Sequence, residues 1–132
     1  MEGKGYSLEK IESLKQERNT IYAELVTSEE IIVNGAAETL EQLEKFYFMA
    51  VVTSAYKEHF DAIHARSGFM KYFSFVLSNG DYARSKPQPD PYLLALEKSG
   101  FEPKDCIVIE DSERGLRAAK ACLLYTSDAA DE

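Results

Sequence analysis

The sequence feature that most constrains the fold is a short apolar run that ends in two adjacent carboxylates. Residues 107–109 are Ile-Val-Ile, and Glu110, Asp111 and Ser112 follow directly, with Gly115 and a helix-forming segment behind them. An apolar run of this length is typical of a buried strand. Two acids at its end repel each other and lose hydration unless a positive group lies against them. The pattern therefore predicts a bound cation, and Mg²⁺ is the natural candidate because it prefers oxygen ligands.

Two further apolar runs predict strands that alternate with helices. Residues 46–52 form a continuous apolar run, as in strands that are covered on both faces, and residues 73–77 form a shorter one. Helical spacing of apolar residues occurs between and around these runs, at 36–45, 56–63 and 92–98. Alternation of this kind predicts an α/β fold with a doubly wound, Rossmann-like parallel sheet.

The two ends of the chain differ from this central part. Residues 7–25 show the spacing of one amphipathic helix, and the capping-box pair Thr27 and Glu30 predicts a second helix that ends before Asn34 and Gly35. We therefore divide the chain into a helical unit at 1–33 and an α/β core at 34–121. Residues 122–132 break the alternation and resemble a translated sequencing adapter, so we interpret them as a non-native tail, with a frayed polar terminus as the alternative.

Composition disfavours several classes of partner. The net charge is −8, from 15 basic and 23 acidic residues, which argues against a nucleic-acid or anionic-membrane surface. Cys106 and Cys122 lack the spacing of a metal site and suit a reducing compartment. The sequence contains no apolar stretch of the roughly 20 residues that a membrane span needs, and its start lacks a signal-peptide pattern. We expect a cytoplasmic protein whose oligomeric state stays open.

Three polar features follow the predicted strands, at the edge where α/β proteins place ligands. Thr53 and Ser54 come after the first strand and could help to hold a phosphate, or could simply cap the next helix. Lys86 lies among prolines in Ser-Lys-Pro-Gln-Pro-Asp-Pro at 85–91, which stiffens its loop, although an isolated loop lysine is usually just solvated.

The acidic pair completes this candidate site. Of Glu110 and Asp111, one carboxylate would bind Mg²⁺ directly, and the other would orient a metal-bound water or pair with Lys86. The alternative is that Asp111 or Ser112 only caps the helix that follows, with Gly115 allowing close packing.

In this order the motifs resemble the haloacid dehalogenase-like hydrolase superfamily, in the helical-cap branch of phosphoglycolate phosphatase-like enzymes and β-phosphoglucomutase. Thr53 matches the second motif, Lys86 in Ser-Lys-Pro-x-Pro-x-Pro matches the third, and residues 107–115 match the fourth. The resemblance runs from about Asn34 to Ala121, and residues 1–33 look like the remnant of the cap. It implies a Mg²⁺-dependent phosphatase, a phosphomonoester hydrolase, that acts on a small phosphorylated metabolite. Thr53 and Lys86 would be catalytic, and Ser54 would join them in binding phosphate.

The sequence departs from this family at one essential motif. Family members carry a strand that ends in Asp-x-Asp-Gly and supplies the aspartate nucleophile, and no such segment occurs in these 132 residues. We therefore expect an internal fragment of a phosphatase, without turnover of its own. A non-catalytic α/β binding module and a sugar-phosphate mutase of the same superfamily are the alternatives.

Overall fold

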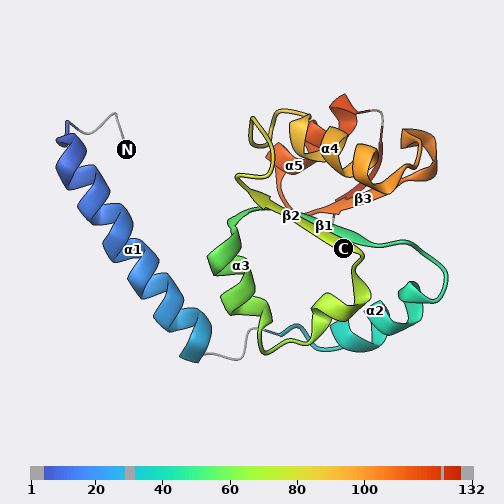
Figure 1. Cartoon of the computed structure of the whole chain (residues 1–132), viewed down its shortest axis with the longest axis horizontal. Coiled ribbons are helices and arrows are strands. Elements are labelled where there is room, and N and C mark those ends of the chain that lie inside the picture. The colour runs from blue at the N-terminus through green and yellow to red at the C-terminus, as the bar shows by residue number, and fades with distance from the viewer. Residues whose placement is uncertain (1–4, 29–31, 123, 129–132) are drawn as a thin grey trace.

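The computed structural model describes residues 5–28, 32–122 and 124–128, and it confirms the predicted α/β fold with parallel strands (Figure 1). The helices are α1 (Leu8–Ser28), α2 (Ala36–Glu44), α3 (Lys57–His64), α4 (Asp90–Ser99) and α5 (Glu113–Ala121). The strands are β1 (Ala50–Tyr56), β2 (Phe75–Asn79), β3 (Ile107–Glu110) and β4 (Tyr125–Asp128). Two short 3-10 helices, η2 (Phe69–Tyr72) and η3 (Pro103–Asp105), lie in the connections.

The strands form two parallel pairs. β1 pairs with β2, with Val52 opposite Leu77, and β3 pairs with β4, with Ile109 opposite Ser127. The β1–β2 register becomes irregular between Val52 and Tyr56. Parallel pairing turns the carboxyl ends of the paired strands the same way, which is where polar groups gather in α/β sheets.

The buried core joins α4 to α5. Its members are the side chains of Tyr92, Ala118, Ala119, Cys122 and Leu124, with Val108 of β3 packed against them. The loop that carries Lys86 leads into α4, and β3 leads through Glu110 into α5. One apolar cluster therefore fixes the positions of both the basic and the acidic motif.

The helix α1 lies apart from the α/β body in Figure 1 and approaches it at α3. The rings of Tyr22 on α1 and His59 on α3 have centroids 5.5 Å apart. The prediction of a second helix that begins at Thr27 is wrong, because α1 continues to Ser28. Glu30, the other half of the expected capping box, lies outside the described residues.

The first strand begins later than the apolar run predicts. Phe46, Tyr47 and Phe48 are 80%, 64% and 49% exposed, and β1 starts only at Ala50. The backbone N–H groups of Phe46 and Tyr47 both donate to the carbonyl of Leu43, so the chain is still completing the turn that ends α2. An apolar run cannot reveal where a helix releases the backbone, which explains the shift.

Residues 125–128 form β4 beside β3, although the sequence pattern set residues 122–132 apart from the fold. β4 follows α5 as a strand follows a helix elsewhere in the molecule. The end of the core at Ala121 and the origin of the segment beyond it stay predictions.

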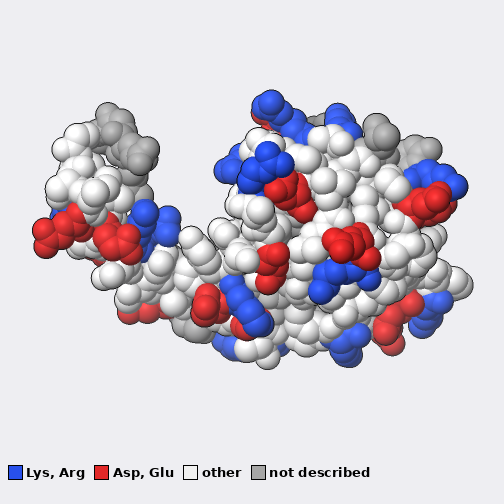
Figure 2. All heavy atoms as spheres, turned by 45° about the horizontal axis from the view of Figure 1, so that its top comes forward, with Lys and Arg blue, Asp and Glu red and all other residues white. Residues whose placement is uncertain are grey.

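On the face shown in Figure 2, basic and acidic side chains lie close to one another, and the basic groups do not gather into a single patch. Such a mixed surface offers no extended positive potential on this face. None of the helices in the described ranges is both long enough and apolar enough to span a bilayer.

Candidate functional site

A cavity of about 460 Å³ lies beside the middle of β1 and the carboxyl end of β3. Its lining comes from three segments that are distant in sequence: Val52, Thr53 and Ser54 of β1, Lys86 of the proline-rich loop, and the run Ile109, Glu110, Asp111 and Ser112. The three polar features that follow the predicted strands therefore meet at one hollow.

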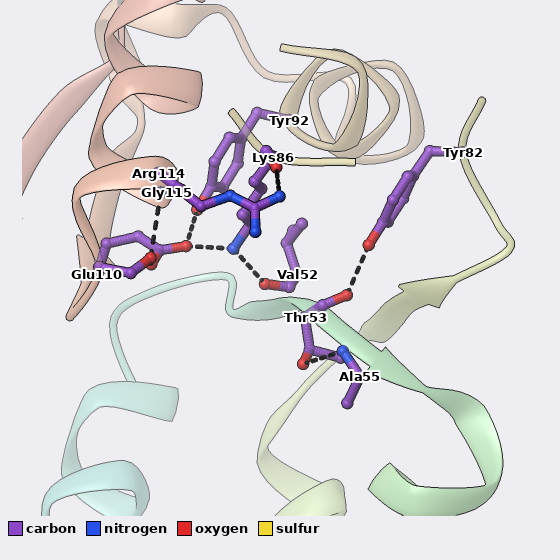
Figure 3. Close-up of polar contacts among 10 residues, drawn as sticks. Val52, Thr53, Ala55, Tyr82, Lys86, Tyr92, Glu110, Arg114 and Gly115 are labelled. Atoms are coloured by element: carbon purple, nitrogen blue, oxygen red, sulfur yellow. Dashed lines mark hydrogen bonds and ion pairs between the residues drawn. The ribbon is translucent and has the colours of Figure 1, made fainter. Parts of the chain in front are cut away.

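The lining of this hollow includes an ion pair between Lys86 and Glu110, whose side chains point toward one another in Figure 3. Both residues are buried, at 6% and 9% exposure. The Lys86 Nζ donates to Glu110 Oε1 and also to the backbone carbonyl of Val52, at 2.9 Å. The ammonium thereby connects the acidic end of β3 to β1.

Three side chains donate hydrogen bonds to the Glu110 carboxylate. Oε1 accepts from Lys86 and from the hydroxyl of Tyr92, and Oε2 accepts from the Ser112 hydroxyl at 3.1 Å. Burial opposes ionisation, but the hydrogen bonds from Lys86 and Tyr92, together with the Lys86 charge, outweigh it and hold the pKa of Glu110 below its usual range. Glu110 is therefore a carboxylate at neutral pH, and both of its oxygens are occupied.

Two residues of α5 complete the support around this pair. The guanidinium of Arg114 donates to the backbone carbonyl of Lys86 and so ties the proline-rich loop to α5. Gly115 leaves space for the acid, because a Cβ at this position would lie 2.0 Å from the Glu110 carboxyl carbon. Ser112 caps α5 by accepting the Gly115 N–H at 3.1 Å, so the capping role considered for Ser112 and the Lys86–Glu110 pairing occur together.

The structure corrects the position of Thr53 and Ser54. We expected them in a loop after the strand, but β1 continues through both to Tyr56, and Tyr56 is the N-cap of α3, so neither hydroxyl caps that helix. Thr53 Oγ1 accepts the Ala55 N–H at 3.1 Å, and the Tyr82 hydroxyl donates to the Thr53 carbonyl at 2.8 Å. The β1–β2 register is irregular beyond Val52, and both residues contribute to the cavity lining.

Of the two carboxylates that line the cavity, Asp111 is the one without a described side-chain partner. Within the described residues, no three His, Cys, Asp or Glu side chains gather into a metal-binding group. Glu110 already has three donors, whereas Asp111 is exposed at the cavity and pairs with no described side chain. Mg²⁺ is commonly held by one or two carboxylates together with water and phosphate oxygens. Among the described acids at the cavity, Asp111 is therefore the one whose carboxylate is suited to a Mg²⁺ ion.

Sequence reasoning missed Tyr92, Arg114 and Tyr82 as parts of the site. The sequence predicted Tyr92 only as part of a helix, although the residue lies in the first turn of α4, close in sequence to Lys86. Arg114 lies within the acidic motif itself, between Ser112 and Gly115. Its position in this motif is the sequence signal that could have identified it as part of the site.

Comparison with known proteins agrees with the family resemblance of the sequence motifs over nearly the whole chain. Residues 3–125 match the family model described as haloacid dehalogenase-like hydrolase. The chain is 31% identical over 125 residues to protein CbbY of Rhodobacter capsulatus, covering 90% of this chain and 55% of that protein. It is also 31% identical over 120 residues to the phosphoglycolate phosphatase of Haemophilus influenzae, covering 90% of this chain and 54% of that protein.

A solved structure shows the same fold. The crystal structure of a predicted phosphoglycolate phosphatase from Haemophilus somnus superposes with a TM-score of 0.85 at 25% identity, covering 93% of this chain and 55% of that one. The chain spans about half, or less, of the length of the curated relatives it matches.

We predict that Gly115→Ala destabilises the chain, although alanine is normally favoured over glycine inside a helix by about 1 kcal/mol. The added Cβ would overlap the Glu110 carboxyl group, and the cost of such overpacking is about 1–3 kcal/mol. Urea unfolding followed by circular dichroism measures the change, with Lys120→Ala on the exposed side of α5 as the control. An increase in stability would show that the glycine is not needed for the approach of Glu110.

The pKa of Glu110 predicts a specific loss of stability in acid. Because this pKa is lower in the folded chain than its ordinary value of 4.5, the unfolded chain binds the proton more readily. The stabilisation by Glu110 is complete above that ordinary value and disappears as the pH falls through the folded-state value. Glu110→Gln leaves the Lys86 charge unpaired and should cost about 3–5 kcal/mol at neutral pH.

The stability difference between wild type and Glu110→Gln should therefore narrow in acid, measured by urea unfolding at neutral pH and at about pH 3. Glu102→Gln is the control, since Glu102 forms only an exposed pair with Lys104. A difference that is constant over this range would contradict the assignment of a lowered pKa to Glu110.

Proposed function

The chain belongs to the haloacid dehalogenase-like hydrolase family, and we propose that it forms the phosphate- and metal-binding part of a Mg²⁺-dependent phosphomonoester hydrolase. The observation that carries this proposal is the Lys86 ammonium, which Glu110 and the Val52 carbonyl hold at a cavity between β1 and the end of β3. The relatives include a phosphoglycolate phosphatase, which supports a small phosphorylated metabolite as the substrate.

Lys86 has the capacity to bind a phosphoryl oxygen. An ammonium has three N–H donors, and Glu110 and Val52 accept from two of them. A remaining donor is available for a ligand in the cavity that Lys86 lines. Glu110 balances the charge of Lys86, and the two hydrogen bonds to Glu110 and Val52 fix the position of the ammonium.

Two hydroxyl-bearing residues of β1 also line the cavity. Thr53 and Ser54 line the same cavity as Lys86, and Ser54 is exposed to it. We assign their hydroxyl groups to the remaining phosphoryl oxygens, with Lys86 supplying the positive charge that offsets charge developing in transfer.

Asp111 would hold the metal ion, and Glu110 would act through Lys86. A bound Mg²⁺ supplies positive charge to the phosphoryl oxygens. Asp111 is suited to this ion because its carboxylate lies at the cavity without a competing described partner. Glu110 keeps the Lys86 ammonium at the cavity. The Ser112 cap fixes the start of α5, which holds both acids at the edge of the cavity.

The chain by itself should bind phosphate without turning over an ester. The family resemblance implies an aspartate nucleophile in an Asp-x-Asp-Gly segment, which these 132 residues do not contain. Loss of a covalent nucleophile removes most of the rate enhancement, leaving what binding and electrostatics supply. We therefore assign this chain the binding half of the chemistry.

We predict that inorganic phosphate binds to the chain in the presence of Mg²⁺ and that Lys86→Ala weakens this binding by about tenfold or more, the effect of losing a charged hydrogen-bond donor. Titration calorimetry measures the affinity. Lys104→Ala is the matched control, because Lys104 is exposed and lies outside the cavity lining. Asp111→Asn should remove the dependence of phosphate binding on Mg²⁺ without removing the Lys86–Glu110 pair.

Equal phosphate affinity in wild type and in a folded Lys86→Ala variant would overturn the assignment of Lys86. The same preparations test turnover with p-nitrophenyl phosphate. Mg²⁺-dependent hydrolysis by the wild-type chain that disappears in Lys86→Ala would show that the chain is active alone, and it would refute the binding-only proposal.

A further inference from the structure

The Lys86–Glu110 pair is contacted from one side by a single aromatic residue. Tyr92 lies in the first turn of α4 and is 5% exposed. Its hydroxyl donates to Glu110 Oε1, the same oxygen that accepts from Lys86. Its ring lies 5.0 Å from the Lys86 Nζ. Tyr92 therefore contacts both members of the ion pair, as the labelled side chains in Figure 3 show.

We propose that Tyr92 is a positioning residue that sets the orientation of the Glu110 carboxylate and, through it, the placement of the Lys86 ammonium at the cavity. This inference rests on the proposed function, because it gives Tyr92 a part in phosphate binding. Tyr92 does not line the cavity itself and would not touch the substrate.

Packing alone does not account for a tyrosine at this position. The ring belongs to the apolar cluster between α4 and α5, a role that phenylalanine would fill equally well. A buried hydroxyl adds a cost of desolvation unless it finds a partner, and here the partner is the one buried carboxylate of the site. The hydroxyl therefore has a local function that the ring lacks.

The hydroxyl restricts the carboxylate because it completes a set of fixed donors. Ser112 holds Oε2, and Tyr92 and Lys86 share Oε1. Tyr92 and Ser112 both belong to elements that the core anchors, whereas the Lys86 ammonium lies at the end of a flexible side chain. With two rigid donors in place, the carboxylate has one orientation. The Lys86 ammonium then takes the position from which it can donate to that carboxylate.

The hydroxyl remains a donor over the whole physiological pH range. Burial raises the pKa of Tyr92, and the neighbouring Glu110 carboxylate, through both its hydrogen bond and its charge, raises this pKa further. Tyr92 consequently holds its proton and serves as a fixed hydrogen-bond donor rather than as an acid or a base.

The test is the variant Tyr92→Phe in the full chain, with two readouts. Carbon-13 NMR of labelled glutamate side chains reports on the Glu110 carboxyl group, whose signal at neutral pH should shift when the hydrogen bond from Tyr92 is removed. Titration calorimetry with inorganic phosphate and Mg²⁺ should show binding weakened by roughly three- to tenfold, the effect of one hydrogen bond. Tyr72→Phe is the matched control, a buried tyrosine outside the cavity lining, and it should change neither quantity.

An unchanged Glu110 carboxyl signal and an unchanged phosphate affinity in a folded Tyr92→Phe variant would overturn the proposal. If the wild-type chain does not bind phosphate, the proposed function fails, and the Glu110 carboxyl signal alone still decides whether Tyr92 holds this carboxylate. A second arm covers a variant that does not fold. Incorporation of 3-fluorotyrosine makes the tyrosine hydroxyl a stronger donor, so the Glu110 carboxyl signal should shift, and an unchanged signal would count against Tyr92.

Discussion

The buried ion pair between Lys86 and Glu110 is the interaction on which the rest of the site depends. Two charges that are removed from water destabilise a fold unless each finds good partners. The surrounding structure supplies them: Val52 accepts from the ammonium, and Tyr92 and Ser112 donate to the carboxylate. The apolar core between α4 and α5 lies next to the pair. It anchors the elements that carry Lys86 and Glu110 and so fixes the two residues relative to each other.

This arrangement divides the work between two neighbouring acids. Glu110 faces inward and is committed to Lys86, while Asp111, the next residue, is exposed at the cavity. One acidic dipeptide therefore supplies both a buried partner for the ammonium and an exposed carboxylate at the cavity. Gly115 makes the inward position possible because any side chain there would occupy the space of the carboxyl group.

Sequence reasoning identified the fold class and the three segments that meet, because each segment carries a local signal: an apolar run, a proline-rich loop or an acidic pair. It placed β1 wrongly, since Phe46–Phe48 are as apolar as a strand and yet complete the turn after α2. It also missed Tyr92 and Arg114. Their contacts to Glu110 and to the Lys86 carbonyl join residues 18 and 28 positions apart, and only tertiary packing creates them.

A double-mutant cycle on Lys86 and Glu110 tests the central claim most directly. The free energy of unfolding is measured for wild type, Lys86→Met, Glu110→Leu and the double variant. If the pair organises the site, each single variant leaves a buried charge unpaired and loses about 3–5 kcal/mol, and the double variant loses far less than the sum. Losses that simply add would show that the two residues act independently and would contradict this account.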